Sequence, residues 1–185
     1  MNMVQSTKRV IADTLKEFMN TKPFDKISVV DIVNKCEINR QTFYYHFQDK
    51  YELLGWIFKE EALSKIKNYK TYATWQEGFL KIFLYVKDNR KLCMNTFRSL
   101  ARDHLDNFLY DITFKLLIDV VNEIADESEV QDKELRFIAN FYSFAFIGIL
   151  TNWMIEGMKE NPEEIINNIN KLIEGDIKRA IEKYK

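Results

Sequence analysis

The chain has 185 residues, of which 46% are hydrophobic and 30% charged, and its formal net charge is −1. A charge so close to neutral argues against indiscriminate binding to anionic polymers. The length is enough for one or two domains with a sizeable core. With only five glycines and two prolines, the composition favours long helices over a many-stranded sheet, so we predict an all-α protein.

The apolar and sulfur-containing residues indicate a cytoplasmic protein with no membrane partner. Two cysteines, Cys36 and Cys93, exclude a disulfide framework and suit a reducing cytosol, where both are expected to be small buried residues. The N-terminal stretch MNMVQSTKRV lacks the apolar region of a signal peptide. The longest apolar run, residues 137–155, is interrupted by polar side chains and predicts a core helix of a soluble bundle rather than a membrane span.

The N-terminal region begins with a helical pattern that ends at a turn signal. Apolar residues recur at helical spacing from Ser6 to about Thr21, and the segment TKPFDK then breaks the pattern. Ser28, with an aspartate three positions later, is typical of a capping box that starts a second helix. This helix is short and is expected to stop near Cys36.

Two further cap signals follow. Asn39 can cap a third helix that runs to about Phe47, and Asp49, with a glutamate three positions later, opens a fourth. Two short helices joined by a tight turn and packed on a longer first helix predict a helix-turn-helix domain over residues 1–50. These residues carry a net charge of +2, whereas residues 51–185 carry −3, a mild contrast in the direction expected of a DNA-facing N-terminus.

The predicted third helix places its side chains on two faces. Ile38, Phe43 and Phe47 are expected to be core. The remaining surface holds side chains that can donate to phosphates or reach base edges, namely Arg40, Gln41, Thr42, Tyr44, Tyr45 and His46. Two neighbouring tyrosines on the surface of a short helix indicate a partner. The alternative is that both rings lie flat on neighbouring side chains with their hydroxyls in water.

From residue 75 onward the pattern is helical throughout, with expected spans 75–88, 90–100, 102–125, 132–159 and 162–183. The last span begins with Asn161 as cap and Pro162 at the first helical position. The last two helices carry more apolar surface than a monomer easily hides, so we predict a homodimer interface there. The residues assigned to it are Phe146, Leu150, Trp153, Ile165, Ile169, Leu172 and Ile173. The alternative is that both helices only close the core of their own chain.

Aromatic residues are frequent after residue 50, and they could line an apolar pocket for a small-molecule effector. The candidates are Trp56, Phe79, Phe83, Phe97, His104, Phe108, Phe141 and Tyr142. For each of them the alternative is ordinary core packing, and His104, between two aspartates, also fits a solvated histidine.

No feature of the sequence predicts an enzyme. The two histidines and two cysteines are widely separated, so no metal site at ligand spacing is expected. None of the common nucleophile, zinc or phosphate-binding motifs occurs, and adjacent carboxylates are typical of solvated helix faces. We therefore predict no catalytic residues, no metal and no cofactor.

The stretch TKRVIADTLKEFMNTKPFDKISVVDIVNKCEINRQTFYYHFQDKYELL resembles the DNA-binding domain of TetR-family transcriptional regulators. The matching features are an amphipathic first helix, ISVVDIV, then INRQTFYYHF and DKYELL in order and without gaps. The combination of INRQTFYYHFQDKYELL with GWIF is also similar to the branch that contains activators of dihydroxyacetone kinase operons. The rest of the chain matches that family only in helical character.

The resemblance implies a dimer that binds a near-palindromic double-stranded DNA operator and is controlled by a small-molecule effector in a C-terminal domain, residues 51–185. Ser28 and Lys50 would contact phosphates, and Arg40 would enter the major groove with its neighbours. The implied DNA-binding residues are Ser28, Asn39, Arg40, Gln41, Thr42, Tyr44, Tyr45, His46 and Lys50. The alternative function is a helical protein–protein interaction module that does not bind DNA.

One residue departs from the family pattern. Many members carry Ala-Gly in the turn between the second and third helices, and this chain has Cys36-Glu37. Because glutamate lacks the freedom of glycine at positive φ, we expect a turn of different shape. Its carboxylate is also expected to repel a nearby phosphate.

Overall fold

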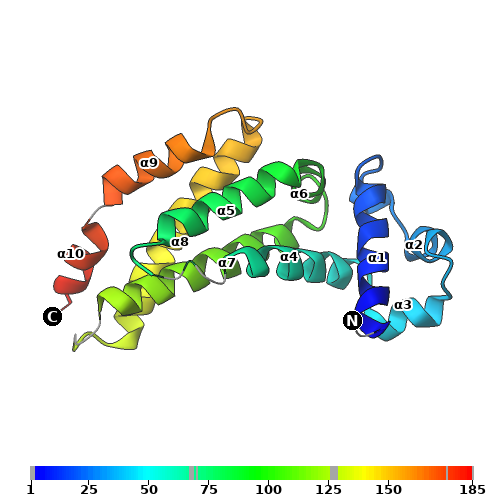
Figure 1. Cartoon of the computed structure of the whole chain (residues 1–185), viewed down its shortest axis with the longest axis horizontal. Coiled ribbons are helices and arrows are strands. Elements are labelled where there is room, and N and C mark those ends of the chain that lie inside the picture. Colours follow the sequence, from blue (N-terminus) through cyan, green and yellow to red (C-terminus); the bar gives the residue numbers. More distant parts are fainter. Residues whose placement is uncertain (1–2, 67–68, 70, 126–128, 174, 185) are drawn as a thin grey trace. The chain divides into compact units, whose positions relative to one another are not determined.

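The computed structural model describes residues 3–66, 69, 71–125, 129–173 and 175–184, which form helices joined by short turns (Figure 1). No strand occurs among these residues, which confirms the all-α prediction. The chain forms two compact units, one made of Met1–Glu61 with Asn89–Phe108 and the other of Ala62–Asp88 with Leu109–Lys185. The first unit extends beyond the predicted helix-turn-helix domain, and the functional division at residue 50 stays a prediction.

The first unit holds the helices that the cap signals predict. Ser28 begins α2 with a complete capping box, in which its hydroxyl accepts from the backbone N–H of Asp31 at 3.1 Å. Asn39 begins α3 by accepting from the backbone N–H of Thr42 at 2.7 Å. The elements are α1 (Met3–Met19), the 3-10 turn η1 (Phe24–Lys26), α2 (Val29–Lys35), α3 (Arg40–His46), the larger part of α4 (Lys50–Ile66), α6 (Arg90–Phe97) and the start of α7 (Arg102–Ile124).

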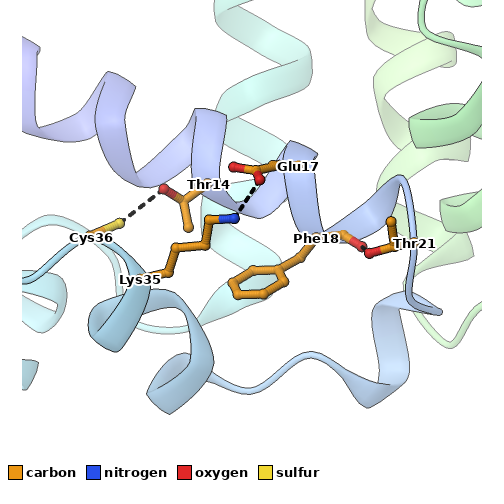
Figure 2. A network of polar contacts seen from close by, with 6 residues as sticks. All are labelled: Thr14, Glu17, Phe18, Thr21, Lys35 and Cys36. Atoms are coloured by element: carbon orange, nitrogen blue, oxygen red, sulfur yellow. Dashed lines mark hydrogen bonds and ion pairs between the residues drawn. The ribbon is translucent and has the colours of Figure 1, made fainter.

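Helices α1 and α2 are joined by a buried apolar contact with a polar rim. Leu15 of α1 and Ile32 of α2 are fully buried. Figure 2 shows the rim, where Lys35 pairs with Glu17 and the Cys36 thiol lies 3.1 Å from the hydroxyl of Thr14. An exposed ion pair of this kind contributes at most about 1 kcal/mol, so the buried side chains supply most of the stability of this contact.

The turn between α2 and α3 keeps a left-handed residue although no glycine is present. Glu37 has φ +55°, and the backbone N–H groups of Glu37 and Ile38 donate to the carbonyls of Asn34 and Val33 at 3.3 and 3.1 Å. These two bonds define a Schellman motif with Glu37 at the position that glycine usually takes. The expectation of a differently shaped turn is therefore wrong, because the motif holds the glutamate in a conformation that costs it energy.

The second unit is built on stacked aromatic side chains. The rings of Phe79 and Phe146 stack with centroids 3.9 Å apart, and Phe83 lies 5.1 Å from Trp153. In Figure 1, α9 runs beside α5, and α10 packs against α8. The elements are α5 (Trp75–Asp88), the greater part of α7, α8 (Asp132–Ile155), α9 (Pro162–Ile173) and α10 (Asp176–Glu182).

Three predicted helix ends are wrong, and left-handed residues explain two of them. Helix α6 ends at Phe97 rather than at residue 100. Helix α8 stops at Ile155 rather than at residue 159, because Gly157 and Met158 have φ +85° and +58° and the Met158 N–H donates to a carbonyl of the last turn. The predicted last helix, 162–183, is two helices, because Gly175 has φ +77° between α9 and α10. The regular isoleucine spacing concealed this break.

By length and composition α8 could cross a membrane, with a mean hydropathy of 1.4 over its most apolar window. Core helices of soluble proteins have the same property. One side of α8, including Ala139, Ser143 and Met154, is completely buried against its own unit, which favours the predicted core helix.

Candidate nucleic-acid interface

Helix α3 separates core from surface as predicted for Phe43 and Phe47, whereas Ile38, also predicted to be core, is only half-buried. Phe43 and Phe47 are at most 2% exposed, whereas Arg40 and Gln41 are exposed. Tyr45 is 77% exposed and Tyr44 is 55% exposed. The alternative in which both tyrosine rings lie flat on neighbours is therefore wrong, and α3 presents two aromatic hydroxyls beside a guanidinium and an amide.

Asn39 and Thr42 fix the first turn of this helix. The side-chain oxygen of Asn39 accepts from both the backbone N–H and the hydroxyl of Thr42, at 2.7 and 2.9 Å. Arg40 and Gln41 lie in the turn that these bonds hold, so the cap orients the two side chains assigned to base reading. The DNA contacts assigned to Asn39 and Thr42 themselves stay predictions.

The end of α3 is surrounded by aromatic rings and one lysine of α1. His46 lies edge-on to Tyr45, with ring centroids 5.0 Å apart. Partial burial, with a smaller contribution from Lys8, lowers the pKa of His46, which favours a neutral ring at pH 7. Lys8 also lies over the ring of Phe47 at 5.2 Å, and no sequence motif marks this lysine as a neighbour of α3.

Ser28 and Asp31 form a closed pair at the start of α2. The carboxylate of Asp31 accepts from the backbone N–H and from the hydroxyl of Ser28, at 2.9 and 2.8 Å. These bonds lower the pKa of Asp31, the backbone bond most strongly. The hydroxyl of Ser28 already donates to Asp31. Its phosphate contact therefore stays a prediction, and it requires the hydroxyl hydrogen to turn away from Asp31.

Lys50 points at the protein backbone. Its ammonium donates to the carbonyls of Phe24 and Ile27 at 2.9 and 2.7 Å, with a third, longer contact of 3.4 Å to the carbonyl of Asp25. It also lies 4.5 Å from the centroid of the Phe24 ring. Desolvation lowers the pKa of Lys50. The geometry assigns this lysine a structural role, and its phosphate contact stays a prediction.

The eight predicted pocket residues come from both compact units. Phe79 and Phe83 are buried in the aromatic stack of the second unit. Trp56, Phe97, His104 and Phe108 belong to the first unit, and Phe141 and Tyr142 to the second. Core packing, the alternative stated for each residue, accounts for Phe79, Phe83 and Phe108.

Four of the remaining candidates line two separate open pockets, whereas Phe97 is half-buried with Arg102 over its ring and borders neither of them. Trp56 and His104 border one of about 700 Å³ beside Tyr51, whose ring stacks on His104 at 5.6 Å. Phe141 and Tyr142 border another of about 610 Å³ between α8 and α10. Burial, mainly, raises the pKa of Tyr142, so its hydroxyl stays protonated and can donate at neutral pH.

The predicted dimer residues are mostly core of their own chain. Five of them are at most 5% exposed within the single chain: Phe146, Leu150, Trp153, Ile165 and Ile169. Leu172 is 75% exposed and Ile173 is half-buried. The alternative, that α8 and α9 close the core of their own chain, accounts for the five buried side chains.

A different side of α8 is exposed and apolar. Phe137, Phe141, Phe144 and Ile155 are each at least 60% exposed, and Gly148 lies between them in the sequence. Their successive spacings of four, three, four and seven residues place all five on one stripe of the helix. We call this set the α8 stripe.

Among the described residues no group of three or more histidine, cysteine or acidic side chains could hold a metal ion. Burial raises the pKa of Cys93 to about 12, so this thiol stays protonated and unreactive.

The family is decided by comparison with known proteins. Residues 11–55 match the description "Bacterial regulatory proteins, tetR family", and residues 73–175 match "Transcriptional regulator C-terminal region". The chain belongs to the TetR family of transcriptional regulators. It is 30% identical over 183 residues to the HTH-type dhaKLM operon transcriptional activator DhaS of Lactococcus lactis subsp. lactis (strain IL1403), covering 96% of this chain and 95% of that protein.

Solved structures of TetR regulators have the same fold. The dihydroxyacetone kinase operon activator DhaS is 29% identical, with a TM-score of 0.71 over 93% of this chain and 96% of that one. The fatty acid degradation regulator FadR from Bacillus halodurans is 15% identical, with a TM-score of 0.65 over 90% and 94%; at that identity the likeness concerns the fold alone. The chain is therefore a DNA-binding transcriptional regulator and not an enzyme.

Proposed function

We propose that this regulator reads its operator with the exposed face of α3, using Arg40 and Gln41 for bases and the tyrosine hydroxyls for phosphates. The observation that carries the proposal is the exposure of Tyr44 and Tyr45 on a helix anchored by the fully buried Phe43. A soluble protein gains nothing from two neighbouring exposed tyrosines unless their hydroxyls bind something, and phosphate oxygens accept such bonds. A guanidinium and an amide in the first turn match the donor patterns of guanine and adenine.

The experiment compares variants on a library of operator sequences. Arg40→Ala and Gln41→Ala should relax base preference at defined positions, each by about 1 to 3 kcal/mol of discrimination. Tyr44→Phe removes one hydroxyl and should weaken binding to all sequences alike. Glu60→Gln, an exposed change on α4, is the matched control and should bind like the unchanged protein. Uniform loss from Arg40→Ala and Gln41→Ala would refute their base-reading role.

The regulator is proposed to act as a homodimer through the α8 stripe. Aromatic side chains bury about 150–250 Å² each and dominate interface energetics. Single apolar residues are common on protein surfaces, but three exposed phenylalanines on one face form a contiguous patch of the kind that marks an interaction site. A second copy fits this face because a two-fold contact is self-complementary. The ridge of Phe137, Phe141 and Phe144 can lie against the groove of about 700 Å³ that runs beside Gly148 between α8 and α9.

Gly148 supports a close helix crossing in the proposed dimer. Glycine inside a helix costs about 1 kcal/mol relative to alanine, and a Cβ added here would meet nothing within 4 Å. Packing within the chain therefore gives no reason for this glycine. An approaching helix from a second copy does, because the missing side chain lets two backbones come close.

A small-molecule effector is proposed to bind between α8 and α10. The pocket of about 610 Å³ lies in the size range of ligand sites. Phe137, Phe141 and Tyr184 offer aromatic walls, and Arg179 and Lys183 lie on its border, a combination that suits an apolar molecule with an acidic group. Phe137 and Phe141 also belong to the α8 stripe, so a ligand here would act directly on the dimer interface.

The similarity to DhaS leads us to propose a gene target. DhaS, an activator of a dihydroxyacetone kinase operon, is similar over nearly the whole chain. This similarity supports control of such an operon by the present chain, acting in the cytoplasm. Binding to DNA upstream of such an operon, with no binding to an unrelated promoter, is the expected outcome.

A further inference from the structure

The segment between α1 and α2, residues 20–27, decides where α2 begins. It ends directly before Ser28, the cap of α2. Phe24 and Ile27 anchor the segment in the core of the first unit, at no more than 1% exposure. Between them only the short turn η1 is formed, so this stretch depends on other elements for the rest of its hydrogen bonds.

Asn95 of α6 makes three hydrogen bonds with one side-chain amide, two to this segment and one to Met19, the last residue of α1. Its nitrogen donates to the carbonyls of Met19 and Lys22 at 2.9 and 2.7 Å, and its oxygen accepts from the backbone N–H of Phe24 at 2.8 Å. Both amide hydrogens and the oxygen are therefore used. Because all three contacts are short and point in different directions, they fix the segment in position, which apolar packing does not do as strictly.

Two further contacts hold the same segment. The carboxylate of Asp25 accepts from the backbone N–H of Leu100, which follows α6, at 3.2 Å. Lys50 at the start of α4 donates to the carbonyls of Phe24 and Ile27. Residues 20–27 are thus held between α6 and α4. The amide of Asn95 and the ammonium of Lys50 make three contacts each, and only Asn95 also holds the end of α1.

We propose that Asn95 is a positioning residue: its amide fixes the segment before α2, and operator affinity depends on the placement of α2 and α3 that follows from it. The proposal rests on the DNA-binding function of the regulator. Asn95 itself need not touch DNA. No helical periodicity or motif in the sequence singles it out, because its partners lie more than seventy residues earlier in the chain.

The test measures operator affinity and stability separately for Asn95→Leu and Asp25→Ala in the full chain. Asn95→Leu removes the three bonds while keeping a side chain of similar size. Asp25→Ala removes only the contact to Leu100 at an exposed residue, so this variant is expected to fold. Asn140→Leu is the matched control, because it removes a side-chain hydrogen bond to Tyr110 in the second unit.

At a temperature well below the melting point of each variant, Asn95→Leu should bind operator on the order of tenfold more weakly, Asp25→Ala less so, and Asn140→Leu as the unchanged protein. Hydrogen exchange should be faster at the N-terminal amides of α2 in Asn95→Leu. Operator affinity unchanged in both Asn95→Leu and Asp25→Ala would overturn the proposal, even if melting temperatures fell. Failure of the unchanged protein to bind DNA would instead refute the regulator function itself.

Discussion

At the residue scale, two side chains differ from their predicted behaviour. The glutamate at residue 37 predicts a turn of different shape, and the family resemblance predicts a phosphate contact at residue 50. In the structure Glu37 adopts the left-handed conformation that glycine usually takes, and Lys50 donates to backbone carbonyls. The residue type at position 37 does not reveal that the Schellman bonds of residues 33–38 form without glycine, and the Lys50 contacts join residues more than twenty positions apart.

We predict that Glu37→Gly stabilises the protein. Glycine reaches φ near +55° without the steric cost that glutamate carries there, so the free energy of unfolding should rise by about 1 kcal/mol. For a chain of this size that corresponds to a melting temperature higher by about 2–4 °C, which calorimetry can measure. Glu37→Gln keeps the strain and removes the charge, so it should leave stability unchanged and strengthen DNA binding. Equal melting temperatures for Glu37→Gly and Glu37→Gln would show that the left-handed backbone conformation of residue 37 does not destabilise the protein.

For Lys50 the structure predicts a loss of stability rather than a loss of phosphate contacts. Lys50→Ala leaves two carbonyls without their cationic donor, which should lower the free energy of unfolding by about 1 kcal/mol. The slope of log affinity against log salt should stay the same. A slope shallower by about 0.9 would instead establish the phosphate contact that the family resemblance implies.

At the element scale, capping signals predict helix starts better than apolar periodicity predicts helix ends. Ser28 and Asn39 cap α2 and α3 as expected, because the side chain and its backbone partner are three residues apart and both are visible in the sequence. The break at Gly175 lies inside an unbroken isoleucine pattern, and the early end of α8 depends on backbone conformation at Met158. Five of the seven residues assigned to the dimer interface are core of their own chain for a related reason. Periodicity predicts that α8 has apolar faces, but not which of them its own chain covers.

The α8 stripe gives the prediction at this scale. Phe144→Glu places a charge in the proposed interface and should convert the dimer to a folded monomer, measured by sedimentation and by circular dichroism. Gly148→Ala should weaken the dimer while the helix itself gains up to about 1 kcal/mol of propensity.

Leu100→Glu is the control for these dimer variants, since Leu100 is 82% exposed and belongs to the first unit. It should leave the dimer intact. A stable Phe144→Glu dimer would show that the α8 stripe is not the dimer interface.

At the scale of the whole molecule, the fold class and the DNA-binding function could be predicted from the sequence, but a single ligand pocket could not. The DNA-binding motif is local, with INRQTFYYHF carrying both its cap and its two faces in consecutive residues. The predicted pocket residues instead divide between two compact units. They were chosen because aromatic residues are frequent after residue 50, and that frequency does not show where each residue lies in the fold. The sequence does not point to Asn95 either, because its hydrogen-bond partners lie more than seventy residues earlier in the chain.

The central claim is that this chain is a regulator that binds DNA through an electrostatic and hydrogen-bonded face of α3. The most direct measurement is operator affinity across a range of salt concentrations, using DNA that flanks its own gene. Log affinity should fall linearly with log salt, by about 0.9 for each phosphate neutralised, and Arg40→Ala should lose preference for the operator over unrelated DNA. Binding that is absent, or that is independent of salt, would contradict the account.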